Sequence, residues 1–475
     1  MANPDLIAGL QSIAGERSVL WRDYDLMVYE YDGSIDKARP SAVVMPSSAE
    51  QVSEIVKLCN RHQVPFTARG AGTGLSGGCL PEHDSVLLVF SKLNRILEID
   101  APNMRAVVEP GVVNLHLSDR TADLGLYFVP DPSSQKACTI GGNVGENSGG
   151  PHTLIYGVTT NHVLGLEVVL PDGEMINVGG KALDAPGYDL VGMFVGSEGT
   201  LGIVTKITVK LTPLPEAVKT LLADFETVAD ASTAVSDIIE SGVVPAALEM
   251  MDNLSIRAVE RSVHAGYPTD AAAVLLIEVE GLRETVSDLV ESAASVCRKN
   301  KARQVRIAGD GKERNLLWAG RKGAFGAMGR LSPDYYVMDG VVPRNRLPEV
   351  LAGIEAVSQK YGLRIANVFH AGDGNLHPLV LWNSDHPGEE EKVRDAGVEV
   401  LDIVAKVGGA LTGEHGIGVE KRDMMGLFFS DDDITTMGWL KKALDPDGVC
   451  NPGKLFPTPG RCIKPRPGRL PVMGW

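Results

Sequence analysis

Two short stretches of the chain carry the residue types best suited to chemistry. In the first, Asn367-Val-Phe-His-Ala-Gly-Asp-Gly-Asn-Leu-His-Pro378, His370 ends one apolar run and His377 opens the next. In the second, Leu411-Thr-Gly-Glu-His-Gly-Ile-Gly418, glycines on both sides free Glu414 and His415 from regular structure. Two histidines and one carboxylate form an open divalent-metal set, and a further histidine beside it can act as a base.

The two imidazoles can share one ion only if they lie on neighbouring strands, because positions seven apart on one strand face opposite sides. Gly372-Asp-Gly374 has turn chemistry, so the sequence predicts a hairpin with His370 and His377 at its mouth. Asp373 is a competing ligand, but in Gly-Asp-Gly it is expected to serve the turn. A lone histidine at a strand end is usually a satisfied polar residue, whereas the two loops together favour a metal site.

Three glycine-rich segments lie in the first half of the chain, at residues 70–78, 139–150 and 195–202. The first fits G-x-G-x-x-G, but Cys79-Leu-Pro81 and a β-rich run follow it, so neither a Rossmann helix nor a P-loop is formed. A nest of main-chain N–H groups around an anion remains, with an ordinary flexible turn as the alternative. Together the three segments suit a large cofactor with a pyrophosphate and rings at both ends.

Composition excludes several classes of protein. Glycine makes up 53 of 475 residues, about 11% against roughly 7% on average. A net charge of −16 argues against nucleic-acid binding, and the longest uncharged apolar stretch, residues 271–277, is far too short for a membrane span. The N-terminus lacks a signal-peptide pattern. Six cysteines without any C-x-x-C pair exclude a disulfide framework and an iron–sulfur ligand set. We therefore expect a cytoplasmic protein.

The sequence pattern changes from glycine-rich segments to alternating helices and strands at Leu211-Thr-Pro-Leu-Pro215, which predicts a domain boundary. Before it, Ser48 is expected to cap a helix that precedes the first glycine segment. Beyond it, expected helices alternate with apolar strands, a pattern typical of an α+β domain with helices on an antiparallel sheet. These helices are expected at 226–240, 282–300, 346–360 and 389–407.

The glycine segments resemble the FAD domain of the vanillyl-alcohol-oxidase/PCMH flavoprotein superfamily. This resemblance implies an α+β fold with a PCMH-type two-part FAD-binding domain and a cap domain of antiparallel sheet covered by helices. Members with covalent flavin carry a histidine where this chain has Thr73, so non-covalent FAD is implied. The implied parts are an N-terminal helical segment (1–37), the FAD-binding domain (38–214), the substrate and metal cap (215–420), a segment returning to the FAD domain (421–457) and a Pro/basic tail (458–475). The implied FAD-binding residues are Arg69, Gly70, Gly72, Thr73, Gly74, Ser76, Gly77, Gly78, Gly141, Gly142, Asn143, Gly145, Ser148 and Gly199.

The two histidine loops, together with Asp445 to Lys454, extend the resemblance to the group of the glycolate oxidase flavoprotein subunit, D-lactate dehydrogenase and D-2-hydroxyglutarate dehydrogenase. By this resemblance one zinc, manganese or iron ion is bound by His370, His377 and Glu414, and His415 is the catalytic base. Arg321 resembles the carboxylate-binding arginine of the group, with an exposed helix arginine as the alternative, and Asn375 is a second substrate-binding candidate. Lys322 is expected to be solvated.

The sequence thus predicts an FAD-dependent 2-hydroxy-acid dehydrogenase, for a small (D)-2-hydroxy acid such as glycolate or D-lactate, with D-2-hydroxyglutarate as the alternative substrate. A metal-dependent hydrolase and a non-catalytic FAD-binding subunit are the rivals from other classes.

The sequence provides no cysteine set for an iron–sulfur cluster, so the reduced flavin must pass its electrons to oxygen or to partner proteins. The resemblance implies an FAD-binding and an iron–sulfur subunit, which would place the protein at the periphery of the inner membrane; a homodimer stays open. The 458–475 tail is expected to be loosely docked or to bind a partner.

Overall fold

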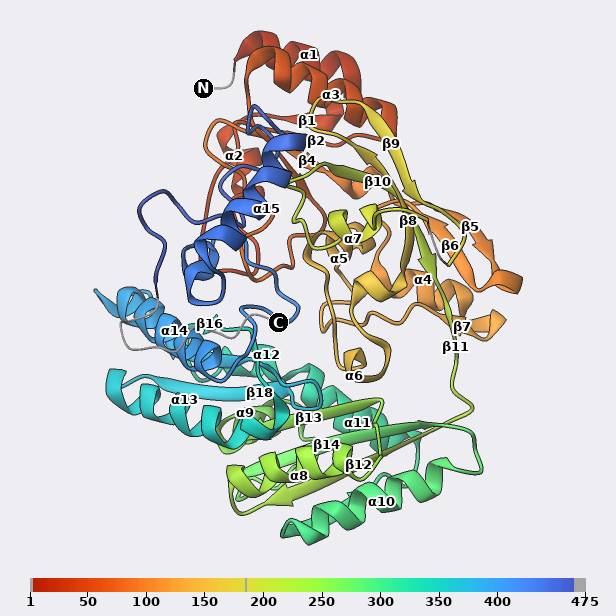
Figure 1. Cartoon of the computed structure of the whole chain (residues 1–475), viewed down its shortest axis with the longest axis vertical. Coiled ribbons are helices and arrows are strands. Elements are labelled where there is room, and N and C mark those ends of the chain that lie inside the picture. The colour runs from red at the N-terminus through yellow and green to blue at the C-terminus, as the bar shows by residue number, and fades with distance from the viewer. Residues whose placement is uncertain (1–2, 184–185, 465–475) are drawn as a thin grey trace. The chain divides into compact units, whose positions relative to one another are not determined.

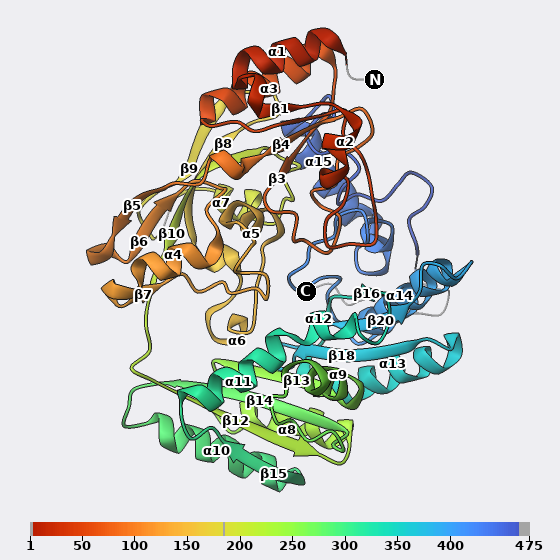
Figure 2. The same cartoon turned by 180° about the vertical axis from the view of Figure 1, so that it is seen from behind.

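The computed structural model describes residues 3–183 and 186–464, which divide into two compact units (Figures 1 and 2). The first unit comprises residues 3–150, 157–214 and 414–464, and the second comprises residues 151–156 and 215–413. Of the expected tail (458–475), residues 465–475 lie outside the described residues. Within the described ranges, no helix combines the length and the apolar character needed to cross a bilayer.

The first unit contains two larger sheets with separate cores, and a two-stranded sheet formed by β7 and β11. A four-stranded sheet has the order β1-β2-β4-β3, in which β2, β4 and β3 are parallel, and a five-stranded antiparallel sheet has the order β5-β6-β10-β8-β9. The strands are β1 (Val19–Leu20), β2 (Ala42–Val44), β3 (Phe66–Arg69), β4 (Val86–Val89), β5 (Ile96–Asp100), β6 (Arg105–Val108), β7 (Leu126–Tyr127), β8 (Val163–Val169), β9 (Met175–Gly179), β10 (Ile203–Lys210) and β11 (Thr212–Pro213). The helices are α1 (Pro4–Ala14), α2 (Asp23–Leu26), α3 (Ala49–His62), α4 (Asn114–Thr121), α5 (Ile140–Glu146), α7 (Leu190–Phe194) and α15 (Asp431–Leu444).

The helix expected after Ser48 is α3, and its start is confirmed by the hydrogen bond that the main-chain nitrogen of Gln51 donates to the Ser48 hydroxyl at 3.2 Å. Its apolar face, which includes Val52, Ile55 and Val56, is fully buried in the core of the four-stranded sheet. The helix connects the parallel strands β2 and β3, so the β3 strand delivers Arg69 directly to the first glycine segment.

The second glycine segment contains a helix, α5, which its glycine-rich sequence did not predict. Glycine disfavours helix by about 1 kcal/mol per residue, but here tertiary packing prevails. Ile140 and Val144 are completely buried, and a Cβ on Gly141 would lie 2.5 Å from the Pro110 Cβ. Only a glycine at position 141 allows the helix to approach residue 110 this closely.

The second unit is built on a nine-stranded antiparallel sheet with the path β15-β12-β14-β13-β18-β19-β17, and β20 pairs with both β18 and β16. Helices α8, α10 and α13 run along it (Figures 1 and 2). The strands are β12 (Ala217–Phe225), β13 (Ala247–Asp252), β14 (Ala273–Gly281), β15 (Ala302–Ile307), β16 (Asp334–Val337), β17 (Gly340–Val341), β18 (Arg364–His370), β19 (Asn375–Leu376) and β20 (Pro378–Trp382). The helices are α6 (Thr153–Tyr156), α8 (Val228–Glu240), α9 (Asn253–Val263), α10 (Val286–Lys299), α11 (Gly311–Lys322), α12 (Ala324–Met328), α13 (Leu347–Tyr361) and α14 (Glu389–Lys406). The α+β class and the antiparallel sheet with helices are as expected.

A short excursion of the chain, residues 151–156, belongs to the second unit and was not foreseen from the sequence. The His152 ring stacks on Trp318 with centroids 6.0 Å apart, and its Nε2 lies 3.4 Å from Glu278. Tyr156 donates a hydrogen bond to Glu280. The excursion is thereby fixed to the β14 strand and the α11 helix.

The chain returns to the first unit at Glu414, seven residues before the expected boundary at 421. Its last part packs against the glycine segments. Asn451 donates side-chain hydrogen bonds to the carbonyls of Gly78 at 2.9 Å and Glu198 at 2.6 Å. The Lys441 ammonium donates to the carbonyl of Thr200 at 2.6 Å. These bonds attach residues 441–454 to the part of the first unit that holds the glycine segments.

Candidate active site

The three glycine segments surround one cleft in the first unit, of about 640 Å³ when the space open to solvent is included. Seven of the residues expected to bind FAD line this cleft: Arg69, Gly70, Gly78, Gly141, Gly142, Gly145 and Gly199. The other seven, Gly72, Thr73, Gly74, Ser76, Gly77, Asn143 and Ser148, are not among its lining residues.

Glycine is required at two positions of the first segment for different reasons. A Cβ on Gly70 would lie 2.3 Å from the Thr139 Oγ1, so this residue allows the first and second segments to meet. Gly77 has a φ of 77°, in the left-handed region that other residues disfavour, and a Cβ there would lie 2.4 Å from Val419. The segment is therefore a tightly packed element, and the flexible-turn alternative does not describe it.

Three of the expected FAD-binding residues that do not line the cleft form hydrogen bonds that stabilise the surrounding loops. Asn143 is buried and accepts a hydrogen bond from the Asn114 side chain at 3.0 Å. The carbonyl of Ser148 accepts from the main-chain nitrogen of Thr159 at 3.0 Å. The carbonyl of Ser76 accepts from the nitrogen of Val419 at 3.0 Å. In this structure these three residues hold the loops together.

Two carboxylates, Glu146 and Glu198, also line the cleft and were missed by the sequence analysis. Burial raises the pKa of Glu146, and the neighbouring Glu198 raises it further. Burial raises the pKa of Glu198 as well, although it accepts hydrogen bonds from the main-chain nitrogens of Ile417 at 2.7 Å and Gly418 at 2.8 Å. Raised pKa values favour the neutral carboxyl forms, which limits the negative charge in the cleft.

The second unit contains the predicted histidine hairpin. β18 ends at His370, residues 371–374 turn, and Asn375 pairs with His370 at the start of β19. The imidazole rings of His370 and His377 have centroids 5.2 Å apart at an interplanar angle of 87°. Asp373 accepts from the main-chain nitrogen of Asn375 at 3.0 Å, which is the expected turn role. The hairpin and the proximity of its two histidines are confirmed.

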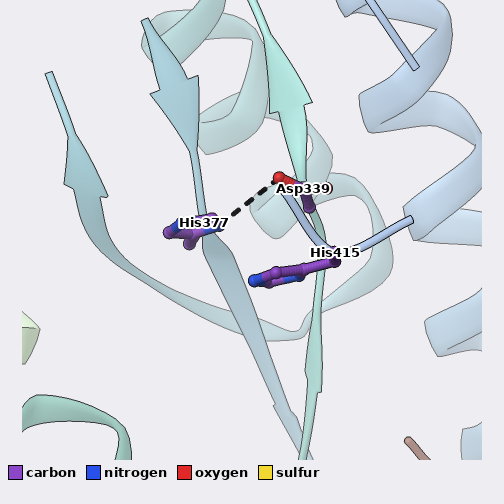
Figure 3. Close-up of side chains that lie close together, drawn as sticks. All are labelled: Asp339, His377 and His415. Atoms are coloured by element: carbon purple, nitrogen blue, oxygen red, sulfur yellow. Dashed lines mark ion pairs between the residues drawn. The ribbon is translucent and has the colours of Figure 1, made fainter. Parts of the chain in front are cut away.

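Each histidine of the pair has a buried carboxylate near its Nδ1. Glu249 on β13 lies 2.8 Å from the His370 Nδ1, and Asp339, between β16 and β17, lies 3.9 Å from the His377 Nδ1 (Figure 3). Neither carboxylate is more than 1% exposed. Burial opposes the ionisation of Glu249, but Arg321 and His370 outweigh it and hold the pKa of this carboxyl below its ordinary value. No local motif in the sequence pointed to either carboxylate.

The second histidine loop is attached to the hairpin through Gly413. Asp339 accepts hydrogen bonds from the Gly413 nitrogen and from the Thr412 hydroxyl. A Cβ on Gly413 would lie 2.5 Å from the Asn375 Cγ, so only glycine fits there. Glu414 and His415 are the next two residues, and consecutive Cα atoms are about 3.8 Å apart. Covalent connectivity therefore keeps both close to this end of the hairpin.

Arg321 is 1% exposed, so the exposed-arginine alternative is wrong. Its Nε donates to Glu249 at 2.7 Å, and its Nη2 lies 2.6 Å from the same carboxylate. Lys322, expected to be solvated, is half-buried, with its ammonium 5.7 Å from the centroid of Trp318. Asn375 is buried, and within the described part of the chain its side-chain oxygen has no hydrogen-bond partner. Arg321 and Asn375 thus lie beside the histidine pair, and their roles toward a substrate stay predictions.

Comparison with known families agrees with this arrangement. Residues 40–179 match the family model of an FAD binding domain, and residues 214–455 match that of the C-terminal domain of FAD linked oxidases. This chain belongs to the FAD-linked oxidase family. The family membership confirms the resemblance on which the sequence analysis relied, and it identifies residues 40–179 as an FAD-binding domain.

Two relatives illustrate the range of this FAD-linked oxidase family. The chain is 52% identical to the glycolate oxidase subunit GlcD of Escherichia coli strain K12, over 94% of this chain and 90% of that protein. It is 34% identical to a D-lactate dehydrogenase of Archaeoglobus fulgidus, over 90% of this chain and 95% of that protein.

Solved structures establish the fold. The structure of p-cresol methylhydroxylase matches with a TM-score of 0.81 at 21% identity, covering 95% of this chain and 96% of that chain. The predicted PCMH-type fold is therefore confirmed. At this identity the likeness concerns the fold alone.

Proposed function

We propose that this FAD-linked oxidase oxidises a small (D)-2-hydroxy acid to the 2-oxo acid, with glycolate or D-lactate as the favoured substrate. The observation that carries the proposal is the pair of perpendicular imidazoles, 5.2 Å apart, at the mouth of a hairpin in a flavoprotein fold. The names of the relatives, a glycolate oxidase subunit and D-lactate dehydrogenases, support this substrate class. D-2-Hydroxyglutarate is the alternative substrate.

We propose further that His370, His377 and Glu414 bind one divalent ion. The residues present fit such an ion: Glu249 faces the Nδ1 of His370, which leaves Nε2 as the ligand atom, and buried imidazoles with carboxylate neighbours are typical of metal ligands. A His₂Glu donor set accepts zinc, manganese or iron. When bound, the ion would lower the pKa of the substrate hydroxyl.

The remaining roles belong to side chains of this protein. His415 accepts the proton of the 2-hydroxyl group, because an imidazole is an effective base near neutral pH. Arg321 directs its Nε and Nη2 at Glu249, which leaves Nη1 for an oxygen of the substrate carboxylate. The side-chain oxygen of Asn375, which has no hydrogen-bond partner among the described residues, can accept a hydrogen bond from the substrate. FAD bound in the cleft of the first unit would supply the hydride acceptor.

The test of the substrate class is anaerobic reduction of the flavin by a panel of acids. Glycolate, D-lactate, L-lactate and D-2-hydroxyglutarate are each mixed with the purified protein, and the flavin absorbance is followed. We expect at least one of the D-2-hydroxy acids or glycolate to bleach the flavin rapidly. An oxidised flavin with all of them, in a protein that dithionite does reduce, would overturn the proposal. A colourless protein without flavin would favour the hydrolase alternative.

The metal is tested by chelation of the same preparation. Dialysis against a strong chelator should remove one divalent ion per chain and abolish bleaching by the substrate, while the FAD content stays unchanged. Readdition of zinc or manganese should then restore bleaching. Full activity in a protein shown by elemental analysis to be free of metal would sink the metal assignment and leave the substrate class standing.

Partners and the mode of FAD attachment complete the proposal. Similarity to a protein named as a subunit supports partner subunits as electron acceptors, one FAD-binding and one carrying iron–sulfur clusters. Slow turnover with oxygen alone, accelerated by an artificial acceptor, is the expected result, and fast turnover with oxygen alone contradicts obligatory partners. Thr73 in place of a histidine supports non-covalent FAD. Acid precipitation should therefore release all of the flavin into the supernatant.

A further inference from the structure

Glu249 is a buried carboxylate that contacts both His370 and Arg321. It lies in the middle of the sheet, on β13, where it pairs in register with His370 of β18. One of its oxygens lies 2.8 Å from the His370 Nδ1, and the other accepts from the Arg321 Nε at 2.7 Å. Glu249, Arg321 and His370 are 1%, 1% and 4% exposed, so no water-filled space separates them from one another.

We propose that Glu249 is a positioning residue that couples the metal ligand His370 to the substrate-binding Arg321. This inference rests on the proposed function. A carboxylate on the Nδ1 of a ligating histidine fixes the tautomer and the ring orientation, so that Nε2 points to the ion. The same carboxylate holds the guanidinium in one orientation and neutralises its charge.

Glu249 can serve both His370 and Arg321 because a buried site needs its positive charge balanced by a nearby negative charge. A buried arginine without a partner is strongly unfavourable, so Arg321 needs an anion when no substrate is bound. Glu249 supplies that anion, with one carboxylate oxygen 2.7 Å from Nε and 2.6 Å from Nη2, and the proposed function assigns the remaining Nη1 to the substrate carboxylate. A displacement of Glu249 therefore disturbs both the ion and the substrate anion, although Glu249 itself touches neither.

The experiment measures metal binding directly, without turnover. Flavin-loaded protein is freed of metal by chelation and titrated with Co²⁺, and the dissociation constant and the visible Co²⁺ absorption spectrum are recorded. We expect Glu249→Gln to weaken Co²⁺ binding about 10–100-fold and to alter the spectrum. In the zinc-loaded protein, the same variant should also raise the substrate concentration needed for half-maximal flavin reduction, because Arg321 loses its fixed orientation.

Asp224→Asn provides the matched control. Asp224 is a buried carboxylate of the same sheet, on β12, and it accepts from the Arg303 Nε at 2.7 Å, but it contacts neither histidine. This variant should leave the Co²⁺ dissociation constant and spectrum unchanged. An equal weakening in both variants would show a general effect of lost ion pairs and would overturn the positioning role.

Loss of folding is addressed by the double variant Glu249→Gln/Arg321→Met, which removes both members of the buried pair and so leaves no unpaired charge. It should fold and should still bind Co²⁺ about 10–100-fold more weakly than the wild type, because His370 lacks its carboxylate. Wild-type affinity in either Glu249 variant would overturn the inference while the proposed function stands. A wild-type protein that binds no Co²⁺ at all would remove the proposed metal site, and this inference with it.

Discussion

Asp339 accepts hydrogen bonds from the main-chain nitrogen of Gly413 at 3.1 and 3.2 Å, and thereby fixes the residue that immediately precedes Glu414 and His415. The same carboxylate lies 3.9 Å from the Nδ1 of His377. One buried acid thus joins the two loops in which the sequence analysis found the candidate chemistry.

Replacement of Asp339 by asparagine should loosen this junction. Asp339→Asn removes the charge and replaces one of the two acceptor oxygens by an NH₂ group, which can only donate, so the hydrogen bonds from the Gly413 nitrogen and the Thr412 hydroxyl are weakened. Gly413, and with it Glu414 and His415, is then held less firmly. We expect the rate of flavin reduction by substrate to fall about 10–100-fold. Stopped-flow reduction measures this rate, with Asp224→Asn as the control for loss of a buried acid. A wild-type rate in Asp339→Asn would contradict the role.

His415→Asn should remove the base while leaving the cofactor and the metal in place. General-base catalysis contributes about 10²–10⁴-fold, so anaerobic bleaching of the flavin by substrate should slow by that factor. The FAD and metal content per chain should match the wild type. His83→Asn, a change of an exposed histidine, serves as the control and should reduce its flavin normally. Rapid bleaching in His415→Asn would show that another group accepts the proton.

Gly141→Ala should damage the FAD cleft. The added Cβ would lie 2.5 Å from the Pro110 Cβ and 2.8 Å from its carbonyl oxygen, so α5 has to move. Overpacking of this kind costs about 1–3 kcal/mol, which corresponds to a dissociation constant for FAD about 5–150-fold higher. Titration of the apoprotein with FAD measures it. In Gly180→Ala, where no atom of residues 3–183 or 186–464 lies within 4 Å of the new Cβ, FAD should bind as in the wild type.

Glu278 should make the second unit sensitive to acid. This carboxylate is fully buried and accepts two hydrogen bonds from Arg314 at 2.8 Å. Burial raises its pKa, but His152 and Arg314 outweigh burial and hold the pKa well below its ordinary value. Because the folded-state pKa is depressed, the stabilisation is complete above the unfolded-state value of about 4.3 and is lost as the pH falls below it.

Glu278→Gln is therefore expected to lower the free energy of unfolding by about 1–3 kcal/mol at pH 7, because the half-buried Arg314 guanidinium loses the carboxylate with which it pairs. The difference from wild type should shrink as the pH falls below about 4.3. Urea denaturation at several pH values measures it, with the exposed pair residue Glu349 replaced by glutamine as a control that changes stability by less than about 1 kcal/mol. A difference that does not depend on pH would contradict the assigned ionisation.

The sequence by itself determined the local features of this protein. The hairpin that brings His370 and His377 together follows from strand periodicity and a Gly-Asp-Gly turn, and the cap of α3 follows from the Ser48 hydroxyl. The glycine segments indicated a cofactor site, because glycine is required where the backbone adopts a φ in the left-handed region or approaches another group closely. Each of these features depends on residues that are near one another along the chain.

Only the tertiary structure decided which carboxylates support the site. Glu249 is 121 residues from His370, and Asp339 is 74 residues from Gly413, and nothing in the sequence between them indicates the pairing. The order of strands in the nine-stranded sheet places β13 beside β18, and this order depends on how helices and strands pack over the whole unit. Packing likewise turned three glycines into part of α5 against their own propensity. A buried charge needs a partner, but the fold determines which residue that partner is.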